Sequence, residues 1–175
     1  DGTIDTDFSG TTMVVGLIRN NMLYCANAGD SRLILGKEGN GKIIAHEVSI
    51  DHKPDAPEEK KRILAAGGRV FAVEYDDGSD GPARVWLGHM DVPGLAMSRS
   101  YGDSVAHSAG VTSIPEHFTV DLTTENFMYL VVATDGLWEC MDNDCAMGSV
   151  AKHGTDCAAA VKELVEEANR RGMRE

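Results

Sequence analysis

The ten residues FMYLVVATDG at positions 127–136 decide the fold of this chain. Residues 127–133 are almost entirely apolar, and a run of this length and composition is typical of a β-strand. We expect this strand to lie at the centre of a sheet, with both of its faces buried. Asp135 and Gly136 follow it, and the glycine lets the backbone turn sharply there. The stretch therefore predicts a rigid strand that carries a carboxylate at its end.

Shorter apolar runs before this strand have the pattern of an antiparallel meander. The pair Asn20-Asn21 separates the first two runs, and asparagine tolerates the positive φ angles of a tight hairpin turn. Further strands are expected over residues 11–19, 22–28, 33–36, 43–49, 70–74, 83–87 and 118–122.

Helix signals place three helices among these strands. Residues 57–66 follow Asp55, a candidate N-cap, and residues 143–150 form a short second helix. Residues 155–171 form a longer one. Its core-facing side is expected to consist of Val161, Leu164, Val165 and Ala168. With no repeat or linker between them, these elements predict one α+β domain over residues 1–175.

Composition and charge narrow the possible classes of function. The chain has 175 residues, of which 28 are acidic and 16 basic, so its formal net charge is −12. This charge argues against binding to nucleic acid or to an anionic membrane surface, since both need a basic face. The four cysteines include no Cys-x-x-Cys pair, and we expect free thiols in a reducing compartment, the cytoplasm or the nucleus.

Two carboxylates that follow predicted strands are candidates for a cation site. Asp135 ends the strand at 127–133, and Asp30 comes after the strand at 22–28 and one glycine. Oxygen ligands held in this way suit a hard cation such as Mg²⁺ or Mn²⁺. Each position is also typical of an ordinary turn, in which Asp135 caps its own backbone or Asp30 pairs with Arg32. Spacing alone favours the ordinary turn at both positions.

Several short motifs occur in a fixed order along the chain. They are Ser9-Gly10-Thr11-Thr12, Ala28-Gly29-Asp30-Ser31-Arg32, Asp51-His52-Lys53-Pro54 with Glu59, Arg62-Ile63 and Gly67-Gly68 after it, Leu95-Ala96-Met97-Ser98-Arg99-Ser100-Tyr101-Gly102-Asp103, Pro115-Glu116, and Ala133-Thr134-Asp135-Gly136-Leu137-Trp138. In order and spacing, these segments resemble the successive motifs of the metal-dependent serine/threonine protein phosphatases of the 2C type.

The resemblance implies a four-layer α-β-β-α sandwich of two antiparallel sheets flanked by helices. It also implies hydrolysis of phosphoserine and phosphothreonine in protein substrates by water held between two Mg²⁺ or Mn²⁺ ions, with a third, weaker ion nearby. Asp135 matches the family aspartate on the second ion, so it is the catalytic candidate. Asp30 matches the aspartate of the third ion. Residues 98–110 match the flap beside the active site, and no cysteine is implied as a nucleophile.

The chain also departs from the family pattern. It has no counterpart of the family's upstream phosphate-binding arginine or Asp-Gly-His-Gly segment, nor of the Asp-Asn pair before the last strand. We therefore expect a partial domain, incomplete at both ends and weakly active or inactive alone. The alternative hypothesis is a catalytically inactive 2C-like domain that binds partners or acts as a scaffold. Loss of strands also predicts exposed sheet edges, and hence a homodimer or strand exchange.

Two other side chains in the motifs are expected to have structural roles. His52 matches a joint between a strand and a helix, so packing is favoured over acid–base chemistry. Arg99 is expected to pair with an acidic neighbour, and contact with phosphate is the alternative.

Overall fold

A computed structural model of the chain describes residues 4–74, 78 and 80–172. These residues group into two compact units. The first unit comprises residues up to 13, 27–30 and 51–116, and the second unit comprises residues 14–26, 31–50 and 117 onward. The prediction of one domain over the whole chain stays a prediction.

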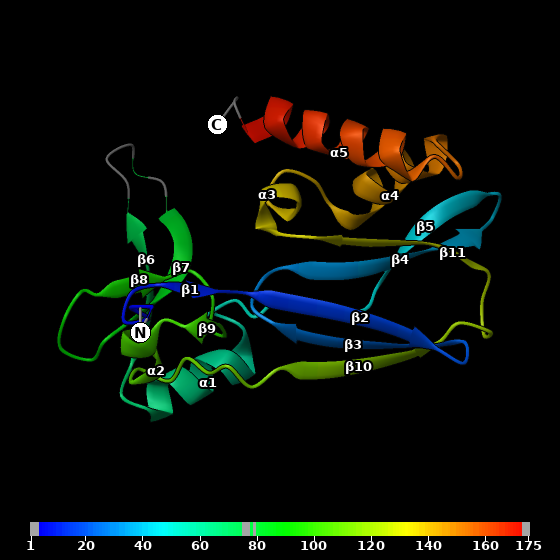
Figure 1. Ribbon diagram of the computed structural model, residues 1–175. Coiled ribbons are helices and arrows are strands. Elements are labelled where there is room, and N and C mark those ends of the chain that lie inside the picture. Colours follow the sequence, from blue (N-terminus) through cyan, green and yellow to red (C-terminus); the bar gives the residue numbers. More distant parts are fainter. Residues whose placement is uncertain (1–3, 75–77, 79, 173–175) are drawn as a thin grey trace. The chain divides into compact units, whose positions relative to one another are not determined.

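The second unit contains two three-stranded sheets (Figure 1). One has the strand order β10 (Glu116–Asp121), β3 (Met22–Ala28) and β2 (Met13–Arg19). The other is antiparallel, with the order β11 (Phe127–Ala133), β4 (Arg32–Gly39) and β5 (Lys42–Glu47). Asn20 and Asn21 join β2 to β3 with φ angles of 51° and 60°, so the predicted hairpin turn is confirmed.

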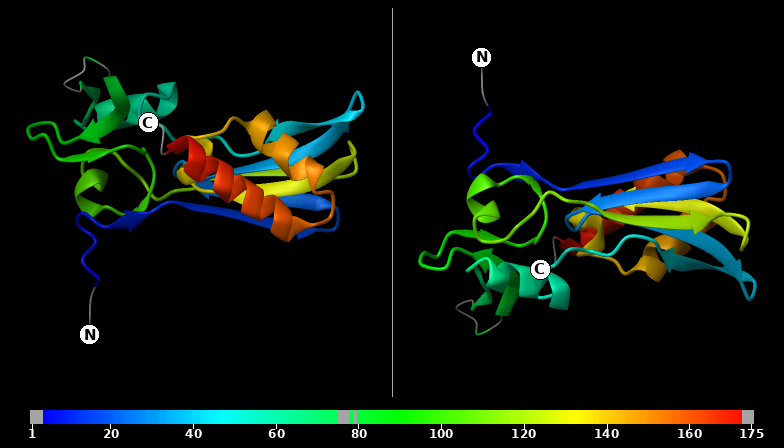
Figure 2. Two further views of the ribbon diagram at one scale, coloured as in Figure 1. Left: turned by 90° about the horizontal axis from the view of Figure 1, so that it is seen from above. Right: turned by 90° about the horizontal axis from the view of Figure 1, so that it is seen from below.

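Two apolar cores hold the layers of the second unit together. The core between the sheets is formed by Leu23, Cys25, Leu33, Leu35 and Val48. On its other face, the sheet that contains β11 packs through Ile34 against three helices: α3 (Asp135–Trp138), α4 (Asn143–Lys152) and α5 (Cys157–Gly172). Figure 2 shows this layering, with α4 and α5 nearest the viewer from above and the strands β2, β3 and β10 nearest from below.

The first unit combines short strands with two helices. A three-stranded sheet has the order β6 (Arg69–Glu74), β7 (Asp80–Trp86) and β8 (Pro93–Leu95), and β1 (Gly10–Thr11) pairs with β9 (Tyr101–Gly102). The helices are α1 (Pro57–Ala65) and α2 (Ser104–His107). Its core is formed by Ile63, Val85, Leu87, Ala106, Ala109 and Val111.

The predicted fold class is confirmed, since the elements form an α+β fold with antiparallel sheets. The bounds of β11 agree with the prediction, but its predicted central position is wrong. In its sheet β4 is the middle strand, and Met128, Leu130 and Val132 of β11 are exposed. A continuous apolar run predicts burial on both faces, but it does not indicate whether a second strand pairs with the far edge.

Two details of the helices also differ from expectation. Ala56, not Asp55, occupies the N-cap position of α1 and makes no side-chain cap, so Pro57 alone marks the start. In α5, Leu164 and Ala168 are buried as predicted, whereas Val161 and Val165 are exposed. Among the described residues, no helix has both the length and the apolar character needed to cross a bilayer.

The sandwich makes a direct prediction about stability. Ile34 of β4 is fully buried, whereas Ile18 of β2 is largely exposed. Ile34→Ala should lower the free energy of unfolding by about 3 kcal/mol, because it leaves a cavity beneath the helices. The control Ile18→Ala should cost less than about 1 kcal/mol. Urea denaturation followed by circular dichroism measures both, and equal losses would contradict the described core.

Candidate functional site

The turn after β3 fixes Asp30 in a buried position. Gly29 has a φ of 119°, and a Cβ atom there would lie 2.3 Å from Cγ2 of Thr12, so this position needs glycine. Asp30, which follows it, is only 3% exposed. Its Oδ2 accepts a hydrogen bond of 2.7 Å from Nζ of Lys53. The carboxylate is therefore buried beside a positive charge.

His52 holds this turn from the other side. Its backbone N–H donates to the carbonyl oxygen of Gly29 at 3.0 Å, and the N–H of Gly29 lies 3.1 Å from Nδ1 of the ring. Nε2 lies 3.3 Å from Oε2 of Glu116. A neutral ring with its proton on Nε2 satisfies both side-chain contacts. Burial, together with the charge of Arg99, lowers the pKa of His52. These contacts give His52 the role of positioning the Asp30 turn.

Asp135 occupies the place that the sequence predicts for it, directly after β11. Thr134 is extended, with φ −82° and ψ 173°, and Asp135 is the first residue of the short helix α3. Trp138 fixes this helix, because its Nε1–H donates to the carbonyl oxygen of Ala133 at 2.8 Å. The guanidinium of Arg32 lies 5.1 Å from the centre of the Trp138 ring. Asp135 is therefore held at the strand end and is half-buried.

The two predicted metal ligands fall in different units, Asp30 in the first and Asp135 in the second. That they share a cation stays a prediction. Within the described ranges, no group of three or more His, Cys, Asp or Glu side chains is arranged to hold a metal ion. Asp30 nevertheless fits a hard cation, because it is a buried oxygen donor that already contacts the ammonium of Lys53. A divalent ion at Asp30 would compete with that ammonium.

A buried cluster around Glu59 was not recognised from the sequence. Glu59, on α1, is 5% exposed and accepts hydrogen bonds from Arg62 at 2.8 Å, Arg99 at 2.6 Å and Ser98 at 2.5 Å. Burial alone raises the pKa of Glu59, but these donors outweigh it and hold the pKa well below its usual range. Glu59 is thus an ionised carboxylate paired with two arginines.

The same arginines also bind main-chain oxygens in the 98–114 segment. Nε of Arg62 donates to the carbonyl of Gly110 at 2.9 Å, and Nη1 of Arg99 donates to that of Ile114 at 3.1 Å. The cluster therefore ties α1 to the loop that matches the family flap. The expected ion pair of Arg99 with an acidic neighbour is found. A signal for the cluster was present in the spacing of Glu59 and Arg62, which places both side chains on one helix face.

A family profile and two curated relatives all name the same protein family. Residues 3–175 match the family profile described as "Protein phosphatase 2C". "Probable protein phosphatase 2C 52" of Arabidopsis thaliana is 42% identical over 168 residues, which cover 95% of this chain and 35% of that protein. "Probable protein phosphatase 2C 64" of Oryza sativa subsp. japonica is 41% identical over 170 residues, covering 96% and 39%. The chain thus spans well under half the length of these curated relatives.

Solved structures resemble the fold. A serine-threonine phosphatase 2C from Toxoplasma gondii superposes with a TM-score of 0.81 at 24% identity, covering 97% of this chain and 56% of that one. A sex determining protein of C. elegans gives a TM-score of 0.75 at 21% identity, covering 93% and 37%. At these identities the likeness concerns the arrangement of strands and helices.

The Glu59 cluster predicts that a small substitution at Glu59 lowers the stability of the chain strongly. Glu59→Gln removes the negative charge between two arginines, and it should lower the free energy of unfolding by about 2–4 kcal/mol. Glu58→Gln is the matched control on the same helix, because Glu58 is largely exposed and its contact with Lys61 is 3.7 Å long. It should change stability by less than about 0.5 kcal/mol. Thermal and urea unfolding measure both, and similar values would show that the cluster contributes little.

Burial of His52 predicts a pH dependence of stability. The pKa of His52 is lowered in the folded chain, so the unfolded chain takes up this proton first as the pH falls. Below about pH 6.5, His52 should therefore reduce the free energy of unfolding by up to about 1.4 kcal/mol per pH unit. His52→Gln should remove this component, whereas His89→Gln, at an exposed position, should leave it. Urea titrations between pH 5 and 8 measure the free energy of unfolding at each pH. If its slope against pH is the same in His52→Gln as in the unchanged chain, the effect is ruled out.

Proposed function

The chain belongs to the protein phosphatase 2C family, and from this we propose that its parent protein hydrolyses phosphoserine and phosphothreonine in protein substrates with Mg²⁺ or Mn²⁺. The observation that carries the proposal is Asp30, a buried carboxylate in contact with a cationic group. A buried carboxylate costs free energy unless a positive charge lies beside it. The Asp30 turn is thus built to accept positive charge.

The two aspartates have distinct parts in this proposal. Asp135, at the end of β11, is the ligand assigned to the catalytic ions, and Asp30 is the ligand assigned to a further ion. A bound Mg²⁺ or Mn²⁺ supplies an activated water and positive charge for the phosphoryl oxygens. Lys53 supplies a monovalent charge to Asp30 and keeps its carboxylate oriented. His52 and Gly29 fix the backbone from which Asp30 projects.

We assign substrate positioning to the loop that begins at Ser98. Arg99 is committed to Glu59 and to the carbonyl of Ile114, which favours a positioning role over direct contact with phosphate. All four cysteines are free thiols, which supports a location in the cytoplasm or the nucleus. None of them has a part in the proposed hydrolysis.

The proposal predicts a loss of activity on removal of one carboxylate. In the full product of the gene, Asp135→Asn should lower Mn²⁺-dependent hydrolysis of a phosphothreonine peptide at least about 10-fold and weaken Mn²⁺ binding measured by calorimetry. Asp55→Asn, at an exposed position, is the matched control and should change neither quantity. Chain 1–175 alone should show little or no hydrolysis.

Two results would contradict the proposal. A folded full-length protein without Mn²⁺-dependent hydrolysis would favour the alternative, an inactive module that binds partners. Normal activity in Asp135→Asn would show that Asp135 is not a ligand of the catalytic ions, and the proposed phosphatase function would still stand.

A further inference from the structure

The hydrogen bonds that hold the Asp30 turn continue into the loop that begins at Ser98. His52 contacts Gly29 through its backbone N–H at 3.0 Å and through its ring nitrogen Nδ1 at 3.1 Å. The carbonyl oxygen of His52 accepts in turn from the backbone N–H of Ser98 at 2.8 Å. His52 is therefore held by the turn on one side and by the loop on the other.

Ser98 is the residue at which this route meets the Glu59 cluster. It is fully buried, and its carbonyl oxygen accepts from Nη2 of Arg62 at 2.8 Å. Its hydroxyl oxygen lies 2.5 Å from Oε2 of Glu59 and 3.0 Å from the carbonyl oxygen of His52. A hydroxyl has one proton, and the shorter contact to an ionised carboxylate is the stronger one. The hydroxyl thus ties Ser98 to α1, while the backbone N–H ties it to His52.

A second contact joins the same part of the loop to the turn. Tyr101 of β9 pairs with Thr11 of β1. The next residue, Thr12, packs against Gly29, since a Cβ atom added at Gly29 would lie 2.3 Å from Cγ2 of Thr12. The first residues of the loop, 98–102, therefore reach the turn through hydrogen bonds and through packing. All of these residues belong to the first unit.

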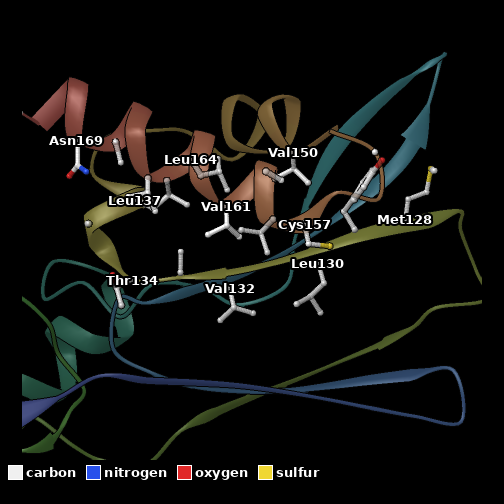
Figure 3. Close-up of a pocket in the computed structure, with 18 residues that line it drawn as sticks. Met128, Leu130, Val132, Thr134, Leu137, Val150, Cys157, Val161, Leu164 and Asn169 are labelled. Atoms are coloured by element: carbon white, nitrogen blue, oxygen red, sulfur yellow. The ribbon is translucent and has the colours of Figure 1, made fainter. Parts of the chain in front are cut away.

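The surroundings of Asp135 are of a different kind. A cavity of about 710 Å³ is lined by the two sequence neighbours of this residue, Thr134 and Gly136, and by apolar side chains of β11 and α5 (Figure 3). In the part of the chain that the structure describes, this lining contains no charged side chain. Buried ionic contacts of the kind found at Glu59 thus have no counterpart in the lining of this cavity.

We propose that Ser98 is a positioning residue for Asp30. Its hydroxyl holds the 98–102 segment on Glu59, and this segment, through His52, holds the Asp30 carboxylate in the orientation that a divalent ion requires. The inference rests on the proposed function, which assigns Asp30 to an ion and the loop to substrate. Without the hydroxyl, the turn gains freedom that ion binding must then remove, so the affinity for the ion falls.

Amide exchange measured by NMR in the metal-free chain tests this link without phosphatase chemistry. In Ser98→Ala, the amides of Gly29 and His52 should exchange at least about 5-fold faster, because local opening of the turn becomes easier. The amide of Val85, in the middle strand of the sheet β6-β7-β8, reports any loss of global stability and should change less.

Ser100→Ala is the matched control for this measurement. Ser100 is a serine of the same loop and is 1% exposed, but its hydroxyl has no hydrogen-bond partner among the described residues. The same substitution at this position should therefore leave the exchange of Gly29 and His52 unchanged.

Mn²⁺ binding by the full product of the gene separates positioning from a merely structural role. Calorimetry identifies the component that Asp30→Asn removes, and Ser98→Ala should weaken this component at least about 10-fold. The Mn²⁺ concentration for half-maximal hydrolysis should rise in parallel, and excess Mn²⁺ should restore kcat. Glu59→Asp keeps the charge but withdraws it from Ser98. It should act in the same direction, and it replaces Ser98→Ala if that variant does not fold.

Three results would overturn the proposal. They are unchanged exchange at Gly29 in both Ser98→Ala and Glu59→Asp, faster exchange with unchanged Mn²⁺ binding, and the absence of any Mn²⁺ binding that depends on Asp30. Failure of the proposed function gives a different result, a full-length protein without hydrolysis in any variant. Exchange and calorimetry still decide the role of Ser98 in that case.

Discussion

The burial of β4 on both faces is the constraint on which the second unit depends. Leu33 and Leu35 point into the core between the two sheets, and Ile34 between them points into the core beneath the helices. β4 is also paired along both edges, with β11 and with β5. Because one strand belongs to both cores, the sheets and the helical layer form together, and the end of β11 where Asp135 lies is fixed by pairing with β4.

The first unit depends on a different kind of contact. Here polar contacts position the backbone. His52 binds the turn that carries Asp30, and Glu59 accepts hydrogen bonds from Arg62, Arg99 and Ser98. Buried charges of this kind are costly when a partner is missing, and a complete set fixes one geometry. The apolar cores therefore set where the strands lie, while the buried polar groups set how the turns and loops between them are oriented.

Much of this arrangement was predictable from local patterns. The turn at Asn20-Asn21 follows from turn chemistry, and the bounds of β11 follow from its apolar run. The edge position of β11 and the exposure of Val161 depend on which elements pack beside them, and no local pattern carries that information. Asp30 and Asp135 were identified by motif order, whereas the Glu59 cluster joins residues 40 positions apart and needed coordinates.

The two arginines of the Glu59 cluster bind the far part of the loop through its main chain, at the carbonyls of Gly110 and Ile114. A carbonyl oxygen is present whatever side chain the residue carries. Residues between these anchor points can therefore be replaced during evolution without loosening the attachment to α1. Such an architecture separates sequence change in the loop from maintenance of the fold, because the loop can vary while the helix beneath it keeps its attachment.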